Sequence, residues 1–312
     1  MFEENEKNLA DLAEEFQIGK SNPDERIAKL SQIQKLYPSQ NTSILNYFIK
    51  MESHPNVLFH IVKSLSKSYN EESINSFIEL LLFKGIYKEN NFKNTDEYMK
   101  VRCLTADILG NIKTPSAVVP LLYVLNNKEE NYKLRLSSAE ALGKIGDRYA
   151  VMPLIDVVSN EEEKSVYLRE SAAKALGMLD DIRAIDPFLK ILEAKKGIID
   201  KFTFLKERVI ESIARIGFRD DKVFKALANA LLDESPCIRL SAVEALAELN
   251  DDRAVELLIS LLKDEEEDVA RGAVEALYYL AGRKYMETLL EMPDLPGWCR
   301  DEAEIILEEE EE

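Results

Sequence analysis

A short pattern of one apolar, one basic and several small residues returns along most of this chain. Its two clearest copies are Leu134-Arg135-x-x-Ser138-Ala139-x-Ala141-Leu142 and Leu168-Arg169-x-x-Ala172-Ala173-x-Ala175-Leu176. The position of the basic residue recurs at 102, 135, 169, 206, 239, 270 and 300, at intervals of 30 to 37 residues. Self-similarity with a period of about 20 to 50 residues is the signature of a solenoid, and this period fits two helices per repeat.

The copy from Asp147 to Leu176 shows how one repeat is expected to fold. Gly146 should end the preceding helix in a left-handed turn, and Asp147 should cap the next one. Apolar residues then follow at helical spacing: Val151, Leu154, Ile155 and Val158 in the first helix, and Leu168, Ala172, Ala175, Leu176 and Leu179 in the second. The sequence therefore predicts an all-α solenoid of roughly eight helical-hairpin repeats, each stacked on the next because none buries its apolar face alone.

The regularity of the pattern divides the chain into three parts of one continuous solenoid. Residues 1–100 keep the apolar spacing without the basic residue, and we expect them to form divergent N-terminal capping repeats. Residues 101–290 are expected to be the regular repeats. Residues 291–312 are expected to form a C-terminal capping helix and an acidic tail.

Charge and cysteine content narrow the possible partners and compartments. The formal net charge of −18 disfavours nucleic acid and anionic membranes, and it suits a protein partner with a basic surface. Cys103, Cys237 and Cys299 share no short-motif spacing, so we expect reduced thiols. The N-terminal residues lack the features of a signal peptide, and no apolar stretch is long enough to cross a bilayer. A cytoplasmic protein is therefore expected.

The repeat and the turn after it together carry a family resemblance. The order Leu-Arg-x-x-Ala-Ala-x-Ala-Leu-Gly, followed by Asp-x-Arg-Ala-x-x-Pro-Leu, resembles the HEAT-like repeats of the phycobilin-lyase group from about Val101 to Leu290. The resemblance implies a right-handed α-solenoid of HEAT-like repeats. It also implies an alternative function as a subunit of an E/F-type phycobilin lyase. Such a subunit presents a linear tetrapyrrole bilin to an acceptor cysteine, with acidic side chains contacting the pyrrole nitrogens.

Two other activities of helical-repeat proteins do not fit these residues. The HEAT-repeat deoxyhypusine hydroxylases bind iron through repeated His-Glu pairs, whereas His54 and His60 are followed here by Pro55 and Ile61. A HEAT-like DNA glycosylase needs an aromatic and basic groove, but this chain is acidic and Trp298 is its only tryptophan. No catalytic residue and no metal site are predicted.

The repeated basic residues are the first candidates for a site. Arg102, Arg135, Arg169, Arg239 and Arg300 occupy the first turn of the second helix of a repeat. A residue that recurs once per repeat is more simply structural. We expect these arginines to pair with turn acids such as Asp233 or Asp264 and with main-chain carbonyls of the neighbouring repeat. The family resemblance implies the same ladder.

A column of acidic residues is the stronger candidate. Six residues after the apolar residue that opens each second helix stand Asp107, Glu140, Lys174, Glu211, Glu244 and Glu275. These positions lie off the buried stripe, and second helices line the concave surface of HEAT-type solenoids, so the five acids are expected to form a ridge that binds a basic partner. The alternative is local pairing of Glu140 with Lys144 and of Glu211 with Arg215.

Two long segments, 83–98 and 195–204, interrupt the short turns. Each lies between the two helices of a repeat, so both are expected to project from the same edge. Their apolar residues include Tyr87, Phe92, Ile199, Phe202 and Phe204. Exposed apolar clusters mark interaction sites, which predicts a docking surface. The alternative is that each loop folds back over its own helices.

Together these features favour a non-catalytic protein-interaction scaffold or assembly factor. It would bind a protein partner through the concave groove and the edge loops, without a cofactor. The bilin lyase subunit stays as the alternative.

Overall fold

The computed structural model describes residues 8–17, 22–84, 95–193 and 203–309. Within these residues there are eighteen α-helices and no β-strand. The helices pair into nine hairpins, one more than the roughly eight expected. The prediction of an all-α solenoid is confirmed. The chain divides into two compact units, Met1–Asp147 and Arg148–Glu312. The boundaries expected at 100 and 290 concern repeat regularity and stay a prediction.

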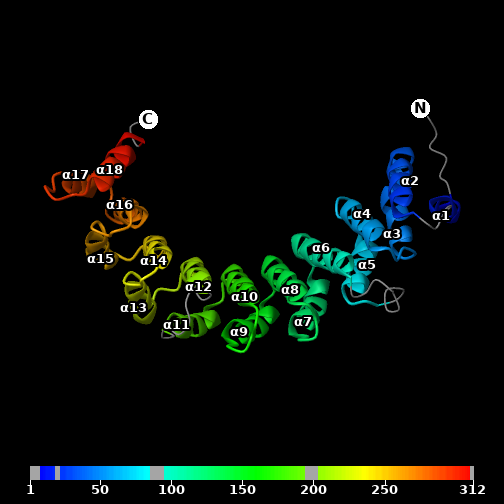
Figure 1. Ribbon diagram of the computed structural model, residues 1–312, viewed down its shortest axis with the longest axis horizontal. Coiled ribbons are helices and arrows are strands. Elements are labelled where there is room, and N and C mark those ends of the chain that lie inside the picture. Colours follow the sequence, from blue (N-terminus) through cyan, green and yellow to red (C-terminus); the bar gives the residue numbers. More distant parts are fainter. Residues whose placement is uncertain (1–7, 18–21, 85–94, 194–202, 310–312) are drawn as a thin grey trace. The chain divides into compact units, whose positions relative to one another are not determined.

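The first unit contains four hairpins. Its first helices are α1 (Leu9–Gln17), α3 (Asn41–Ile49), α5 (Glu71–Leu81) and α7 (Val118–Asn126). Its second helices are α2 (Pro23–Leu36), α4 (Pro55–Leu65), α6 (Asp96–Ile112) and α8 (Tyr132–Ile145). The second helices pack on one another in chain order, and each also packs on its own first helix (Figure 1).

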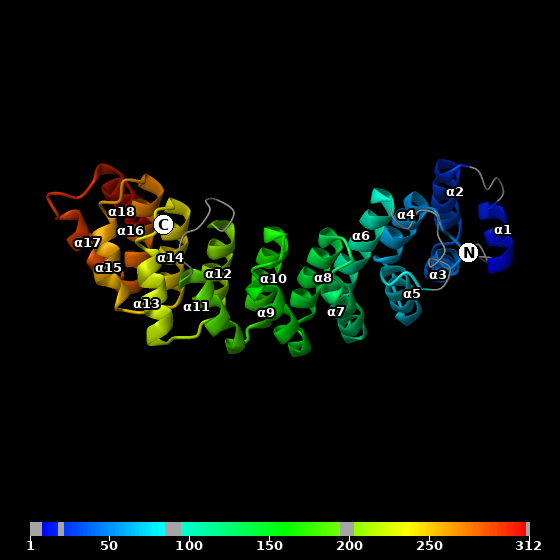
Figure 2. The same ribbon diagram turned by 60° about the horizontal axis from the view of Figure 1, so that its bottom comes forward.

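The second unit contains five hairpins. Its first helices are α9 (Val151–Ser159), α11 (Ile185–Glu193), α13 (Asp221–Ala230), α15 (Ala254–Leu261) and α17 (Arg283–Leu290). Its second helices are α10 (Val166–Leu179), α12 (Thr203–Ile216), α14 (Pro236–Glu248), α16 (Glu267–Ala281) and α18 (Gly297–Glu309). These second helices form one layer on the inner side of the curve of this unit, and the first helices form the other layer (Figures 1 and 2).

The core consists of the apolar stripes that the repeat pattern indicates. In α10 the five residues predicted to be buried, Leu168, Ala172, Ala175, Leu176 and Leu179, are all buried. Helix α10 begins at Val166, two residues before the expected start, because Ser165 caps it by accepting a hydrogen bond from the Leu168 amide at 3.2 Å. The faint N-terminal pattern is also real, since Val57, Ile61 and Leu65 of α4 are fully buried.

The turns between hairpins use left-handed residues, as predicted for Gly146. Gly146 follows α8 with a φ of 82°. Asp180 follows α10 and Asn250 follows α14, and each has a φ of 50°. Asp and Asn tolerate this conformation better than other residues with a Cβ. Asp181 then caps the following turn by accepting a hydrogen bond from the Arg183 amide at 3.0 Å. The repeated turn sequence therefore encodes a repeated backbone path.

Small residues bring consecutive second helices into close contact. A Cβ on Gly177 of α10 would lie 2.8 Å from Oγ of Ser212 on α12. That hydroxyl donates a hydrogen bond to the main-chain oxygen of Ala173 at 3.0 Å, so the contact is also polar. The small residues predicted at the middle of the stripe, including Thr105 and Ala242, are fully buried.

No helix in the described part of the chain is long and apolar enough to span a membrane.

Candidate functional site

The repeated basic residues are structural, as expected. Arg102 is only 2% exposed; its Nε and Nη2 donate to the main-chain oxygen of Leu81 at 2.9 and 2.7 Å. Its guanidinium also pairs with both carboxylate oxygens of Glu130, at 2.9 and 2.7 Å. The ring of Phe83 lies under the same guanidinium, 4.0 Å from its central carbon. A group with this many internal contacts is held by the fold and is not available to a ligand.

The carbonyl partners differ from the prediction. Arg135 Nε donates to Leu125 at 2.9 Å, and Arg169 Nε donates to Val158 at 2.9 Å. These carbonyls belong to the first helix of the arginine's own hairpin and not to the neighbouring repeat. Arg300 of the last hairpin likewise donates to Leu290 at 2.8 Å. The expectation was wrong because a linear repeat does not reveal which helix end faces the arginine.

The acidic partners come from the next hairpin. Arg239 pairs with Asp264 through two bonds of 2.8 and 2.7 Å, and Lys206 pairs with Asp233 at 3.2 Å. Both acids were predicted as partners of the repeated basic residues, and Asp264 pairs with a repeated arginine, as predicted. Arg102 thus links the end of its own first helix to Glu130 in the turn of the next hairpin, and Lys206 and Arg239 reach the equivalent turn acids Asp233 and Asp264.

In the first unit, the acidic column contains Asp107 and Glu140. The Asp107 side chain is 48% exposed and accepts a hydrogen bond from Asn111 at 3.2 Å. Lys144 forms an ion pair with Asp107 of the preceding second helix. The alternative pairing of Lys144 with Glu140 on its own helix is therefore not the one observed. Glu140 is half-buried.

In the second unit, the column contains Glu211, Glu244 and Glu275, which are all exposed. Although Glu244 is exposed, the partial burial of its carboxylate raises its pKa, and the charges of Glu211 and Glu275 raise that pKa further. Burial and the charge of Glu302 raise the pKa of Glu275. Glu211 pairs with Arg208, three residues earlier, and not with Arg215. These carboxylates lie close enough across consecutive helices to repel one another, which supports a continuous acidic surface within this unit.

Most of the expected docking residues lie outside the described part of the chain. Tyr87 and Phe92 of the first insertion belong to this group, as do Ile199 and Phe202 of the second. Phe204 is described; it stands near the start of α12 and is 63% exposed. Phe83, where the first insertion begins, is instead buried and stacks on Tyr98 with ring centroids 5.2 Å apart. That end of the insertion therefore packs on its own hairpin.

Sequence reasoning missed two glutamates beside the acidic column. Glu170 of α10 and Glu207 of α12 are half-buried, and burial is the main cause that raises the pKa of each. The charges of Glu211 and Glu170 raise the pKa of Glu207 further, while Arg208 lowers the pKa of both glutamates. The signal was the sequence aromatic-Leu-basic-Glu at the start of two consecutive second helices. Repeat periodicity does not single out this sequence, because it occurs in only two of the second helices.

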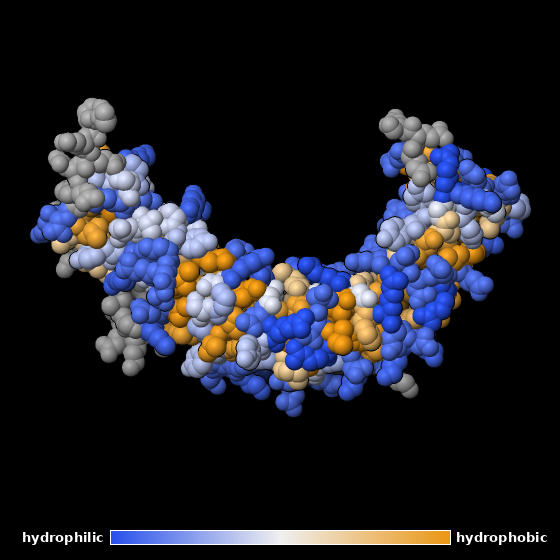
Figure 3. Space-filling model, turned by 180° about the vertical axis from the view of Figure 1, so that it is seen from behind, coloured by the Kyte–Doolittle hydropathy of each residue, from blue (hydrophilic) through white to orange (hydrophobic). Residues whose placement is uncertain are grey.

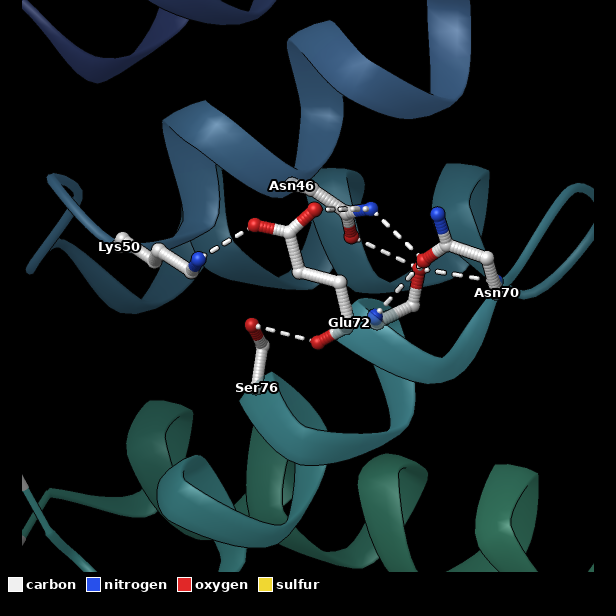
Figure 4. A network of polar contacts seen from close by, with 6 residues as sticks. Asn46, Lys50, Asn70, Glu72 and Ser76 are labelled. Atoms are coloured by element: carbon white, nitrogen blue, oxygen red, sulfur yellow. Dashed lines mark hydrogen bonds and ion pairs between the residues drawn. The ribbon is translucent and has the colours of Figure 1, made fainter.

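A polar network in the first unit has a structural explanation. Asn46 of α3 is almost fully buried, donates to Asn70 at 2.9 Å and accepts from the hydroxyl of Ser73 at 2.7 Å (Figure 4). Asn70 and Ser73 form a capping box at the start of α5. Glu72 pairs with Lys50 at 2.5 Å beside a shallow hollow between the same two helices. Four of the labelled side chains, Asn46, Lys50, Asn70 and Glu72, thus fix α5 against α3, whereas Ser76 donates within α5 to the main-chain oxygen of Glu72 at 3.1 Å.

Exposed apolar side chains are scattered over the surface. The face shown in Figure 3 has apolar patches separated by hydrophilic residues.

Among the described residues, no group of three or more His, Cys, Asp or Glu is arranged to hold a metal ion. Cys103, Cys237 and Cys299 form no disulfide among the described residues, and burial raises the pKa of Cys299 to about 11.

Comparison with known families decides the classification. A family model described as HEAT repeats matches residues 93–166, 120–202 and 200–278. The chain belongs to the HEAT repeat family. The matched region covers the regular repeats from α6 to α16, and the resemblance seen in the sequence is confirmed. A search of curated protein sequences gave no significant match.

Solved structures are similar to this chain at low sequence identity, and the first two below share its fold. Kap95p, from a complex with RanGDP, aligns with a TM-score of 0.58 and 13% identity over 96% of this chain and 46% of that chain. YibA of Escherichia coli aligns with a TM-score of 0.52 and 16% identity over 83% and 94% of the two chains. A complex of CpcE and CpcF of phycocyanin lyase from a Nostoc species has a TM-score of 0.46 and 22% identity over 78% and 90%.

Proposed function

We propose that this HEAT repeat protein is a non-catalytic scaffold or assembly factor that binds a protein with a basic surface. The observation that carries the proposal is the row of exposed carboxylates on consecutive second helices of the second unit. Glu211, Glu244 and Glu275 repel one another, and this repulsion is relieved when a cationic partner binds. Solenoid surfaces of this kind serve as extended binding surfaces, and Kap95p is a HEAT-like solenoid that binds a protein.

The experiment compares two variants with the same change in charge. One reverses four acids of the column, Glu140, Glu211, Glu244 and Glu275, to Lys. The control reverses four exposed acids outside it, Glu129, Glu162, Glu256 and Glu291, to Lys. Each immobilised protein captures partners from a lysate of the native host, and mass spectrometry identifies them. We expect the parent and the control to capture the same basic protein and the column variant to lose it. Equal capture by all three would refute the proposal.

The edge loops extend the proposal. Replacing residues 196–203 with a Gly-Asn turn should abolish capture and barely change the melting temperature if that segment docks the partner. A loss of stability with capture retained would identify a structural plug. Phycobiliproteins among the captured proteins would instead favour the bilin-lyase alternative, which no observation in the described residues supports over the scaffold.

A further inference from the structure

Two consecutive second helices in the second unit begin with the same sequence of residue types. Tyr167-Leu168-Arg169-Glu170 lies at the start of α10, and Phe204-Leu205-Lys206-Glu207 lies at the start of α12. The two middle residues of each belong to the repeat pattern described above. The aromatic residue and the glutamate are three positions apart, so they share one face of their helix.

The two aromatic residues are exposed, because the fold does not bury their rings. Tyr167 and Phe204 are each 63% exposed. The equivalent positions on the next two second helices are Cys237 of α14 and Asp268 of α16, so the repeat itself does not require a ring there. Two exposed rings therefore stand on neighbouring helices at the same level of the stack, where the repeat does not require them.

The glutamates are the reverse case, because they are polar groups drawn partly into the protein. Oε1 of Glu170 and Oε1 of Glu207 are buried and accept no hydrogen bond from the described residues. The two carboxylates interact electrostatically across the packed helices α10 and α12. A buried acceptor without a donor is costly, which favours a side-chain rotation that brings either oxygen to the surface and to a ligand that supplies N–H groups.

Arg208, whose charge acts on both glutamates, does not satisfy these oxygens. Arg208 follows Glu207 on α12, and its ion pair is with Glu211. Lys174 is exposed one turn beyond Glu170. Against these two cations stand the carboxylates of Glu170, Glu207 and Glu211, and those of Glu244 and Glu275 continue the acidic surface on α14 and α16.

We propose that Tyr167, Glu170, Phe204 and Glu207 form a receptor for one arginine side chain of the protein partner. The inference rests on the proposed function and names the anchor within that surface. A guanidinium presents five N–H donors in a plane, so it can pair with both carboxylates while its faces stack on the two rings. A lysine ammonium offers a point charge and no flat face, so arginine binds preferentially.

The test measures binding of an acetylated and amidated tetra-arginine peptide to the full chain by calorimetry at low salt. Tetra-lysine and tetra-citrulline serve as comparison peptides. The site variants are Glu170→Gln with Glu207→Gln, and Tyr167→Ser with Phe204→Ser. The matched controls are Glu248→Gln with Glu256→Gln, which changes the net charge equally at exposed positions, and Tyr279→Ser, which removes another exposed ring. Circular dichroism verifies that each variant is folded.

We expect the glutamine pair to weaken tetra-arginine binding about tenfold and the serine pair to weaken it about threefold. Both controls should stay within about twofold, and tetra-lysine should bind the parent more weakly than tetra-arginine. Failure of the parent to bind tetra-arginine, or equal losses in site and control variants, would overturn the receptor. A further pair, Glu244→Gln with Glu275→Gln, separates the two proposals. If only this pair weakens binding, the acidic column keeps its support and the receptor is wrong.

Discussion

Gly110 of α6 lies directly against Ala141 of α8. A Cβ built on Gly110 would stand 2.7 Å from Cα and 2.9 Å from Cβ of Ala141, closer than real side-chain contacts. Main chain meets main chain at this point, so neither side can yield by changing a rotamer. The distance between these two second helices is therefore set by the absence of one methyl group.

We predict that Gly110→Ala destabilises the first unit although alanine favours helices. Separating α6 from α8 costs about 1–3 kcal/mol, more than the gain in helix propensity of up to about 1 kcal/mol. Chemical denaturation of the full chain measures the difference. Gly297→Ala is the control, because a Cβ there meets nothing within 4 Å. A Gly110→Ala protein as stable as the parent would show that the helices can move apart freely.

Arg102→Met should be among the most damaging single changes in the first unit. It leaves Glu130 and the oxygen of Leu81 without their donor, and losing one member of a buried pair costs about 3–5 kcal/mol. Arg102→Lys should rescue little, because an ammonium group cannot reach both partners. Arg253→Met, which removes the two ion pairs of a half-exposed arginine with Asp221 and Asp251, should cost less, at most about 2 kcal/mol. Similar losses for Arg102 and Arg253 would contradict the structural role.

The Asp181–Arg183 pair should make stability depend on pH. Hydrogen bonding from Arg183 lowers the pKa of Asp181 from 3.8 to about 2. A lowered pKa means that the stabilisation is present above pH 3.8 and is lost as the pH falls toward 2. Asp181→Asn should therefore cost about 2 kcal/mol at pH 7, with a smaller difference from the parent at pH 3. Urea unfolding at both pH values tests this. Asp252→Asn, at an exposed position in the equivalent turn of a later hairpin, is the control.

Glu244 should behave in the opposite way. Its pKa is raised, so its charge opposes folding at neutral pH, and that penalty disappears as the pH falls through the raised pKa. We expect Glu244→Gln to raise the melting temperature at pH 7 by about 1–2 °C and to have no effect near pH 4. Glu256→Gln, at an exposed position of α15, should lack this dependence. A fall in the melting temperature of the Glu244 variant at pH 7 would show that the carboxylate stabilises the fold.

The repeat pattern made the solenoid fold predictable. The number of hairpins was harder to predict from the sequence. Periodicity identifies helices whose apolar stripe and arginine recur, which covers α6 through α16. Helix α1 has no such arginine, yet Leu12 and Phe16 are buried and Phe16 stacks on Phe48 with centroids 4.4 Å apart. Leu12 and Phe16 keep helical spacing without the arginine, so the repeat pattern alone does not count this hairpin.

The exposure of the acidic column was predictable from position, whereas its pairing was not. Counting residues along a helix places Glu211 off the buried stripe. It does not determine whether Arg208 or Arg215 reaches that carboxylate, because both stand at helical spacing. The interaction between Glu170 and Glu207 joins residues 37 positions apart across two helices. Only the packed structure shows that contact.

The basic residues at the hairpin junctions make the joints interchangeable. Lys206 meets Asp233 in the turn of the next hairpin, and Arg239 meets Asp264 in the hairpin after that. If the hairpin of α13 and α14 were excised, Lys206 would find Asp264 at the place that Asp233 had occupied. A hairpin can thus be lost or duplicated at this place while the new seam still joins a cation to an acid. A protein built this way can change the length of its binding surface in single genetic steps without redesigning a core.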